Sequence, residues 1–239
     1  DGEARSASDS RAAKPRDRDS APNFGSDASR RLPKLLPGIN LVHGLDGERS
    51  ETFEHNKQFL QDVLDEGLML RRINIRQVMA FEGTEMSETG AEIARDHKKQ
   101  FKQYKREVRE EIDNAMLQRV APPGTVLPDV HLEYHQDGKT FGRQLGTYAL
   151  LVAVPGEREL GRVVDVAVTD HGYRSVTGVP YPLDLNAASM DELTAVPGIG
   201  KQTAGDVVVN RPYGSVGEVG AVDADLERFA TVDAPERAD

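Results

Sequence analysis

The sequence predicts an α/β fold in three successive parts: parallel β/α units, a small all-β barrel and a small helical domain. Strand-like and helix-like segments alternate first, β-branched segments separated by turn signals follow, and an Ala-rich end holds two short helical segments. We place these parts at residues 34–120, 121–184 and 185–239. Residues 1–33 contain so few apolar side chains that we expect a disordered tail or insertion.

The amino-acid composition excludes several kinds of site and structure. The 239 residues include 40 acidic and 30 basic side chains, for a net charge of −10, and no cysteine. A chain without cysteine forms no disulfide and ligates no iron–sulfur cluster on its own. The longest apolar run, Tyr148 to Val154, is shorter than the ~20 residues of a membrane helix. We therefore expect a cytoplasmic protein with no membrane partner.

The first part alternates strands and helices. Residues 38–44 form a short apolar run bounded by glycine, which predicts a buried strand. Ser50 would cap a helix that Gly67 ends, and a second strand would span 68–78. A long polar helix would run from about 87 to 112. Strand, helix, strand, helix is the order of parallel β/α units.

The second part begins after Pro122-Pro123-Gly124 and closes at Pro180 and Pro182. Its β-branched segments are 126–134, 146–154 and 162–169. Turn signals such as Asp137-Gly138 separate them, so we expect a small antiparallel sheet or barrel.

Basic and aromatic side chains interleave in this second part. The basic residues are Lys139, Arg143 and Arg174, and the aromatic residues are Tyr134, Phe141, Tyr148 and Tyr173. Oligonucleotide-binding (OB) barrels combine backbone attraction with base stacking in this way. The segment loosely resembles a TRAM domain, a small RNA-binding barrel, which implies nucleic-acid contacts by Lys139, Arg143 and Arg174. The alternative is that the aromatic rings fill the core and the arginines lie at its rim.

The third part carries the most specific local motif. Ser189 and Glu192 have the spacing of a capping box, and Pro197-Gly198-Ile199-Gly200-Lys201 follows. The glycines would turn with positive φ, and the amides of Gly198, Gly200 and Lys201 would open the next helix as an anion site. Residues 185–204 resemble a helix-hairpin-helix element, which implies binding to a nucleic-acid backbone by Pro197, Gly198, Ile199, Gly200 and Lys201. Residues 185–239 contain ten acidic and four basic side chains, so a hairpin that only packs or docks a partner is the alternative.

A glycine-containing loop, residues 44–53, follows the first strand, and residues 71–78 look like the next strand. Together with the domain order, these segments resemble the C-terminal part of archaeal radical S-adenosylmethionine enzymes over residues 34–232. The resemblance implies S-adenosylmethionine and a 4Fe-4S cluster in the parent enzyme, although the family's CxxxCxxC motif is absent. The expected cofactor or substrate contacts are Gly44, Gly47, Glu48, Asn74, Arg76 and Gln77. Asn74, Arg76 and Gln77 could instead form a polar layer inside a barrel.

Three further features have a functional and a structural interpretation. His131 and His135 have metal-ligand spacing, but a surface pair is favoured, so no metal site is predicted. The basic run 97–106 fits an amphipathic helix with a solvated basic face, and RNA contact is the lesser alternative. His43 would be a hydrogen-bonded core residue or a substrate contact.

The leading hypothesis is the C-terminal portion of a radical S-adenosylmethionine iron–sulfur enzyme that modifies, or is positioned by, a nucleic acid such as tRNA. Its catalytic residues are unknown, and its partners would be tRNA or DNA and the missing N-terminal half of the barrel. The alternative is a non-enzymatic nucleic-acid-binding or scaffolding protein that acts through its hairpin. The first residue is Asp1 and not Met, so we suspect a fragment. A third possibility is that this fragment does not fold stably, because an incomplete barrel leaves open strand edges and a half-covered core. The acidic, Lys-poor composition suggests a halophilic source, and the resemblance an archaeal one.

Overall fold

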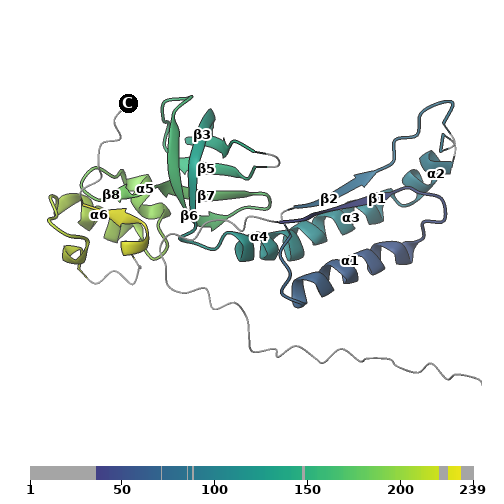
Figure 1. The fold of residues 1–239 in the computed structure, drawn as a ribbon, viewed down its shortest axis with the longest axis horizontal. Coiled ribbons are helices and arrows are strands. Elements are labelled where there is room, and N and C mark those ends of the chain that lie inside the picture. Colours follow the sequence, from purple (N-terminus) through teal and green to yellow (C-terminus); the bar gives the residue numbers. More distant parts are fainter. Residues whose placement is uncertain are drawn as a thin grey trace, which may run out of the picture.

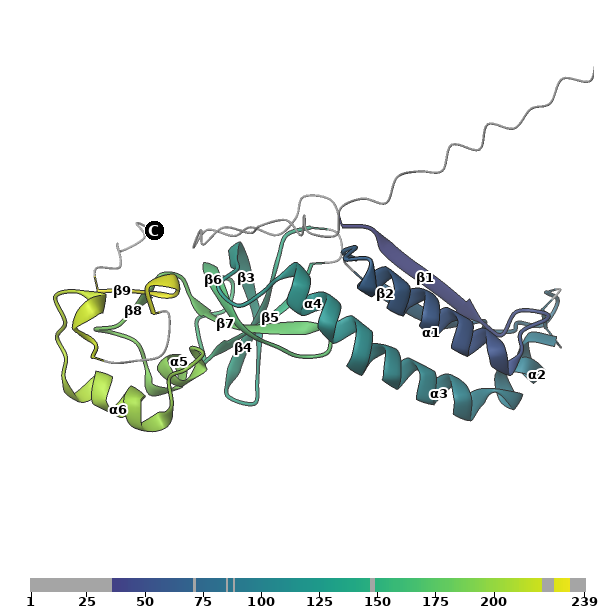
Figure 2. The same ribbon diagram turned by 90° about the horizontal axis from the view of Figure 1, so that it is seen from below.

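A computed structural model describes residues 36–70, 72–84, 86–87, 89–146, 149–220 and 226–232. A closed β-barrel lies between a β/α part and a small helical domain, and both views show this order (Figures 1 and 2). The expected tail at 1–33 lies outside the described residues. No helix among the described residues is long and apolar enough to cross a membrane.

The β/α part is a two-stranded parallel sheet with helices packed against it. Strands β1 (Gly38–His43) and β2 (Arg72–Gln77) pair in register along their full length, and α1 (Ser50–Asp65) connects them. The predicted first helix is confirmed, with Gly67 at φ +74 just after it. The expected cap is wrong, because the N-cap residue with extended backbone is Arg49 and Ser50 is already helical. The sheet has only these two strands among the described residues, so a partial (β/α) barrel is not confirmed.

The two faces of this sheet differ. Ile39, Leu41 and Ile73 pack against the helices in one core with Phe53 and Leu60. Because successive side chains on a strand point to opposite faces, the positions between them form the other face. There Asn74 donates a hydrogen bond to Asn40 at an exposed position. The helices thus cover one face and leave a polar one.

The single long helix expected at 87–112 is wrong in its extent and continuity. The chain forms α2 (Thr89–Asp96), α3 (Lys98–Glu107), the π-helical turn η1 (Val108–Asp113) and α4 (Asn114–Val120). His97 interrupts the helix between α2 and α3. The helix extends past 112 because Met116 and Val120 continue the buried face of Ile112 at four-residue spacing.

The barrel has five strands and an OB-like topology. Its strands are β3 (Val126–Gln136), β4 (Lys139–Gln144), β5 (Leu151–Pro155), β6 (Val163–His171) and β7 (Ser175–Pro180). They close in the order β3-β4-β5-β7-β6, and β5–β7 is the one parallel pair. The barrel confirms the expected β part, but β4 and β7 were not predicted. A glycine interrupts the apolar pattern of each: at Gly142 in β4, a Cβ would lie 2.3 Å from the carbonyl oxygen of His131.

The barrel core consists of aliphatic side chains. Val130, Val152 and Val166 lie in it, and Leu117 from α4 and the adjacent Ala121 join the same cluster. Helix α4 therefore connects the barrel to the β/α part. At the other end, Ala167 and Val179 of the barrel belong to the core of the helical domain. Barrel and helical domain thus share buried apolar surface.

Candidate nucleic-acid interface

The hairpin consists of α5 (Met190–Ala195) and α6 (Lys201–Val209). The capping box at the start of α5 is confirmed: the Glu192 amide donates to Ser189 Oγ at 3.3 Å, and the Ser189 amide donates to Glu192 Oε2 at 2.7 Å. Leu193 and Ile199 are buried in the domain core. The ends of the domain are held together by the short parallel pair β8 (Leu183–Asp184) and β9 (Ala230–Thr231).

The two glycines of the hairpin loop have different backbone roles. Gly198 has φ +84, a region that other residues rarely adopt. Gly200 has φ −83 and ψ 170 at the N-cap of α6, so the expectation of positive φ there is wrong. An added Cβ at Gly200 would meet no atom within 4 Å. Neither the backbone nor the packing of the chain requires glycine at position 200.

The loop exposes donors that suit an anion. The first amides of a helix lack intrahelical acceptors and carry the positive end of the helix dipole. In α6 these amides begin at Lys201, whose side chain is exposed. The loop also lines a hollow that includes Asp170 of the barrel. That carboxylate accepts the backbone amide of His171 at 2.8 Å, which disperses part of its charge.

Other basic residues near the hairpin have structural partners. Arg158, from the loop after β5, forms an ion pair with the buried Glu192. The guanidinium of Arg211 donates to the carbonyl oxygens of Leu185 and Ala188. The hairpin is therefore packed on the barrel and presents its loop at the same time, so the two interpretations are compatible.

The barrel carries the aromatic pair Tyr134 and Phe141 outside its core. Tyr134 and Phe141 stack with ring centroids 5.2 Å apart, and both are half-buried. The alternative that these rings fill the core is wrong, because the core cluster is aliphatic. Lys139 is exposed at the start of β4, and Arg143 pairs with Glu133 at 2.9 Å on the surface. Tyr148 lies outside the described residues.

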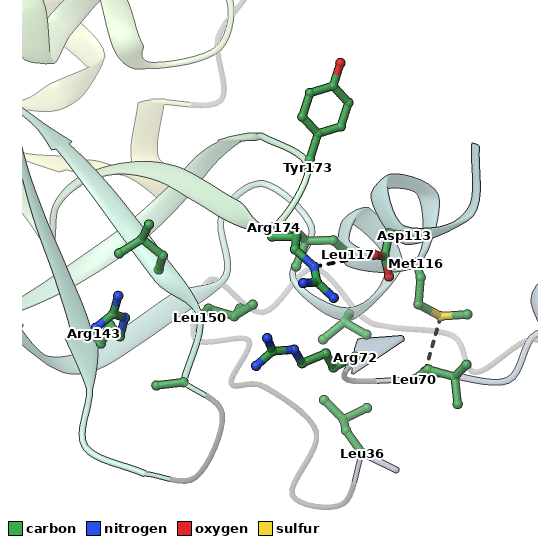
Figure 3. A pocket seen from close by; sticks show the side chains of 13 residues that line it. Leu36, Leu70, Arg72, Asp113, Met116, Leu117, Arg143, Leu150, Tyr173 and Arg174 are labelled. Atoms are coloured by element: carbon green, nitrogen blue, oxygen red, sulfur yellow. Dashed lines mark hydrogen bonds and ion pairs between the residues drawn. The ribbon is translucent and has the colours of Figure 1, made fainter. Parts of the chain in front are cut away.

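Arg174 does not lie on an open barrel surface. It extends from the β6–β7 loop to the β/α part, where it donates to the carbonyl oxygen of Ile73 at 2.7 Å. Its Nε is 3.7 Å from the carboxylate of Asp113. Burial raises the pKa of Asp113, and the nearby guanidinium of Arg174 opposes that rise. Figure 3 shows Arg174 in a cleft with Arg72.

The glycine-containing loop after β1 is built around a buried histidine. His43 is fully buried, with Nδ1 2.9 Å from Glu48 Oε2, and it stacks on Phe53. The second oxygen of Glu48 accepts the Gly44 amide at 3.1 Å. Gly44 and Gly47 both have positive φ. Of the two interpretations of His43, the hydrogen-bonded core residue describes this geometry, and Glu48 is its partner.

The remaining residues expected to contact a cofactor lie on two different faces of the sheet, because successive side chains of a strand point to opposite sides. Asn74 and Arg76 lie on the polar face of the sheet. Gln77 is on the opposite face, and its amide donates to the carbonyl oxygen of Ala94 in α2 at 3.3 Å. Gln77 therefore does not share a surface with Asn74 and Arg76.

One histidine of the β3 pair has a backbone partner. His135 Nε2 is 2.7 Å from the carbonyl oxygen of Arg158, and a β-bulge lies between Leu132 and Tyr134. Within the described ranges, no group of three His, Asp or Glu side chains could hold a metal ion.

Comparison with known proteins identifies the hairpin. A sequence model of the helix-hairpin-helix motif matches residues 183–209. A protein of Archaeoglobus fulgidus described as uncharacterised is 43% identical over 192 residues, which are 80% of this chain and 35% of that protein. An uncharacterised protein of Methanocaldococcus jannaschii is 51% identical over 149 residues, 62% of this chain and 27% of that protein. The chain thus contains a helix-hairpin-helix motif and spans about a third of the length of the archaeal proteins it matches.

Proposed function

We propose that this chain binds the sugar–phosphate backbone of a nucleic acid through the loop of its helix-hairpin-helix. The observation that carries the proposal is Gly200, where glycine is unnecessary for the fold and a side chain would project from the first turn of α6. A phosphate held by the amides that follow Gly200 would approach the backbone closely, and that approach explains a missing Cβ. Lys201 adds the adjacent positive charge.

The barrel supports this proposal with a second kind of contact. The stacked, half-buried Tyr134 and Phe141 and the exposed Lys139 lie on the β3–β4 hairpin of an OB-like barrel. In OB barrels, oligonucleotides bind to the face of the second and third barrel strands, which are β4 and β5 here, and to the loops after the first and fourth barrel strands. Partly exposed rings can stack on bases of any sequence. We propose that the hairpin positions the backbone and the barrel contacts unpaired bases.

The charge of the chain predicts a modest salt dependence. With a net charge of −10, long-range attraction to phosphate is opposed, so binding must depend on local amides and a few cations. Each phosphate neutralised contributes about −0.7 to −0.9 to the slope of log affinity against log salt. We expect a slope of only about −1 to −3.

The test is binding of the full chain to labelled tRNA and to duplex DNA across a salt titration. Gly200→Ala tests the close approach, and Lys201→Glu tests the charge. Gly205→Ala is the matched control, because it adds a methyl group to the same helix at another position where no atom lies within 4 Å. We expect the first two substitutions to weaken binding about tenfold or more and the control to leave it unchanged. Equal binding by Gly200→Ala and the natural chain would contradict the proposal.

A second candidate function is suggested by the polar face of the β1–β2 sheet. The resemblance to radical S-adenosylmethionine enzymes would place Asn74 and Arg76 inside a barrel that other strands complete. Because 192 residues are 35% of it, the Archaeoglobus fulgidus relative is about 550 residues long. A complete (β/α) barrel needs about 250 residues, so such a protein has room for one.

The residues of this chain fit those cofactors only in part. The chain has no cysteine, so a 4Fe-4S cluster would be held by other parts of a longer protein. Glu48 already holds His43 and the Gly44 amide, and Gln77 faces α2. We therefore propose the Gly44–Gly47 loop, Asn74 and Arg76 as the residues near S-adenosylmethionine.

The measurement for this second candidate is the iron and acid-labile sulfide content of the full-length Archaeoglobus fulgidus relative after anaerobic reconstitution. About four irons per chain, together with saturable binding of S-adenosylmethionine, would support an enzyme of this class. A protein that retains no iron would exclude it and leave the nucleic-acid-binding function by itself.

A further inference from the structure

Helix α3 carries positive charge along its exposed side. Lys98, Lys102 and Arg106 follow one another at four-residue spacing, so they lie on one face of the helix. Lys99, seven residues before Arg106, borders the same face. All four side chains are exposed, whereas Tyr104 points into the core of the β/α part. We call Lys98, Lys99, Lys102 and Arg106 the basic stripe.

Acidic side chains nearby do not neutralise the basic stripe. Glu107, the acidic residue of α3, pairs with Lys57 of α1 at 2.9 Å. Glu111 of η1 pairs with the same lysine. These two glutamates therefore join their helical segment to α1. Among the described residues, no acidic side chain lies within ion-pair distance of any of the four stripe residues.

This placement of charge opposes the stability of the helix. Like charges four residues apart repel each other, and the stripe contains two such pairs, Lys98 with Lys102 and Lys102 with Arg106. Lys98 and Lys99 also occupy the first turn, where the helix dipole favours acidic side chains and α3 has none. Burial lowers the pKa of the adjacent Lys105, and the charges of two nearby arginines lower it further. Helix stability therefore does not explain the stripe, whereas an anionic partner would relieve its repulsion.

The stripe also contrasts with the rest of the chain. The sequence has a net charge of −10 and nine lysines, four of which lie between positions 98 and 105. Acidic side chains already favour solubility, so solubility does not require a cluster of lysines. A row of exposed cations instead matches a polyanion, because each phosphate of a nucleic-acid backbone carries a negative charge.

We propose that the basic stripe binds the phosphate backbone of the same nucleic acid that the hairpin loop holds. The inference rests on the proposed function and extends it to a ligand long enough to contact both sites. In Figure 2, α3 and α6 lie along the lower side of the molecule with the barrel between them, so one elongated ligand along that side would meet both. From Lys98 to Arg106 the helix rises about 12 Å, a length that about three or four phosphates of one duplex strand occupy.

The experiment measures binding of the full chain to DNA of two lengths across a salt titration. The probes are a stem-loop with a stem of about 6 base pairs and a duplex of about 30 base pairs, which are about 20 and 100 Å long. Lys98→Gln/Lys102→Gln removes two charges of the stripe and substitutes a residue of similar helix propensity. Lys98→Arg/Lys102→Arg is the matched control, because it keeps both charges. Arg162→Gln removes a positive charge from an exposed barrel position beside Glu159.

We expect the double glutamine variant to bind the long duplex about tenfold more weakly at low salt. Its slope of log affinity against log salt should be smaller in magnitude by about 1 to 2, because each lost phosphate contact removes about 0.9. The double arginine variant and Arg162→Gln should bind as the natural chain does. The urea midpoint of the double glutamine variant should not fall, since it removes a like-charge pair, and this separates a lost contact from a lost fold. Unchanged affinity and slope in this variant would overturn the inference and leave the stripe to an acidic protein surface.

Lys201→Glu distinguishes failure of the stripe from failure of the hairpin. If both proposals hold, Lys201→Glu weakens binding of both probes, and the double glutamine variant reduces the advantage of the long probe over the short one. If only the hairpin proposal fails, Lys201→Glu has no effect and the double glutamine variant still weakens binding of the long duplex. If only the stripe proposal fails, Lys201→Glu weakens binding and the double glutamine variant binds both probes as the natural chain does.

Discussion

The barrel and the β1–β2 sheet differ in how their strands are paired and covered. In the barrel each of the five strands pairs on both sides, and its interior is filled by valine and leucine. In the described part of the β/α unit, two strands pair only with each other. One face of this two-stranded sheet packs on the helices, and the other face is polar. Free strand edges and an uncovered face are features that folded proteins usually cover.

This difference separates what each region can do. The closed barrel and the hairpin share a buried core and therefore form one packed unit. Strand β2 contributes Arg72 to the wall of the cleft that also holds Arg174, and the sheet leaves a polar face that its helices do not cover. The comparison predicts that the barrel with its hairpin is the more stable unit and that the β/α unit unfolds more readily.

Core truncations give the largest expected effect. Leu127 in the barrel and Ile73 in the β/α unit are both almost fully buried. Leu127→Ala and Ile73→Ala should each cost about 2–5 kcal/mol, through lost burial and a residual cavity. Unfolding in urea, followed by hydrogen exchange of each region, should show Ile73→Ala opening β1–β2 while the barrel amides stay protected. Simultaneous loss of protection in both regions would show one cooperative unit and break the comparison.

The attachment of hairpin to barrel is tested by Glu192→Ala. This change removes a capping-box partner and leaves Arg158 without its buried ion partner. We expect the free energy of unfolding to fall by about 2 kcal/mol. This is less than for a fully buried ion pair, because Arg158 is partly exposed. The control is Asp191→Ala on the exposed side of the same turn, with urea midpoints as the measurement. A midpoint for Glu192→Ala equal to that of the control would mean that the ion pair does not hold the hairpin.

Gly198 and Gly200 of the hairpin loop are expected to differ in how much they contribute to stability. Gly198→Ala should destabilise the chain by about 1 kcal/mol, because alanine is strained at φ +84. Gly200→Ala should change stability by less than about 0.5 kcal/mol, since φ is ordinary and the space is open. Thermal unfolding of the two variants side by side measures the difference. A large stability loss in Gly200→Ala would assign that glycine to folding and remove its value as a binding probe.

The smallest effect is the pH dependence of Asp113, at the junction of the two regions. Burial raises its pKa in the folded chain above the unfolded value, so its contribution to stability is complete below the unfolded pKa. That contribution is lost as pH rises through the folded pKa. Asp113→Asn should therefore gain stability relative to the natural chain as pH increases from about 4 to 7. The difference is read from urea unfolding at a series of pH values, and a constant difference would place Asp113 outside the buried junction.

Local signals in the sequence were sufficient for the hairpin. The spacing of Ser189 and Glu192 predicts the capping box because that contact lies within one turn, and the structure confirms it. The strand at 38–44 and the helix from Ser50 also follow from local patterns. By contrast, β4 and β7 contain glycines that lie close to the backbone of the strand paired with them, such as Gly142 beside His131. Such contacts leave no periodic apolar signal.

The sequence by itself determined the order of the parts, the motif in the hairpin and the absence of cysteine ligands. Only the tertiary structure decided which polar residues meet. It brings Arg72 and Arg174, about a hundred positions apart in the sequence, to one cleft. It also pairs His43 with Glu48 in the core and places Gln77 away from Asn74. The physical reason is that charge and hydrogen-bond partners are selected by packing between elements, whereas caps and turns are selected by neighbours along the chain.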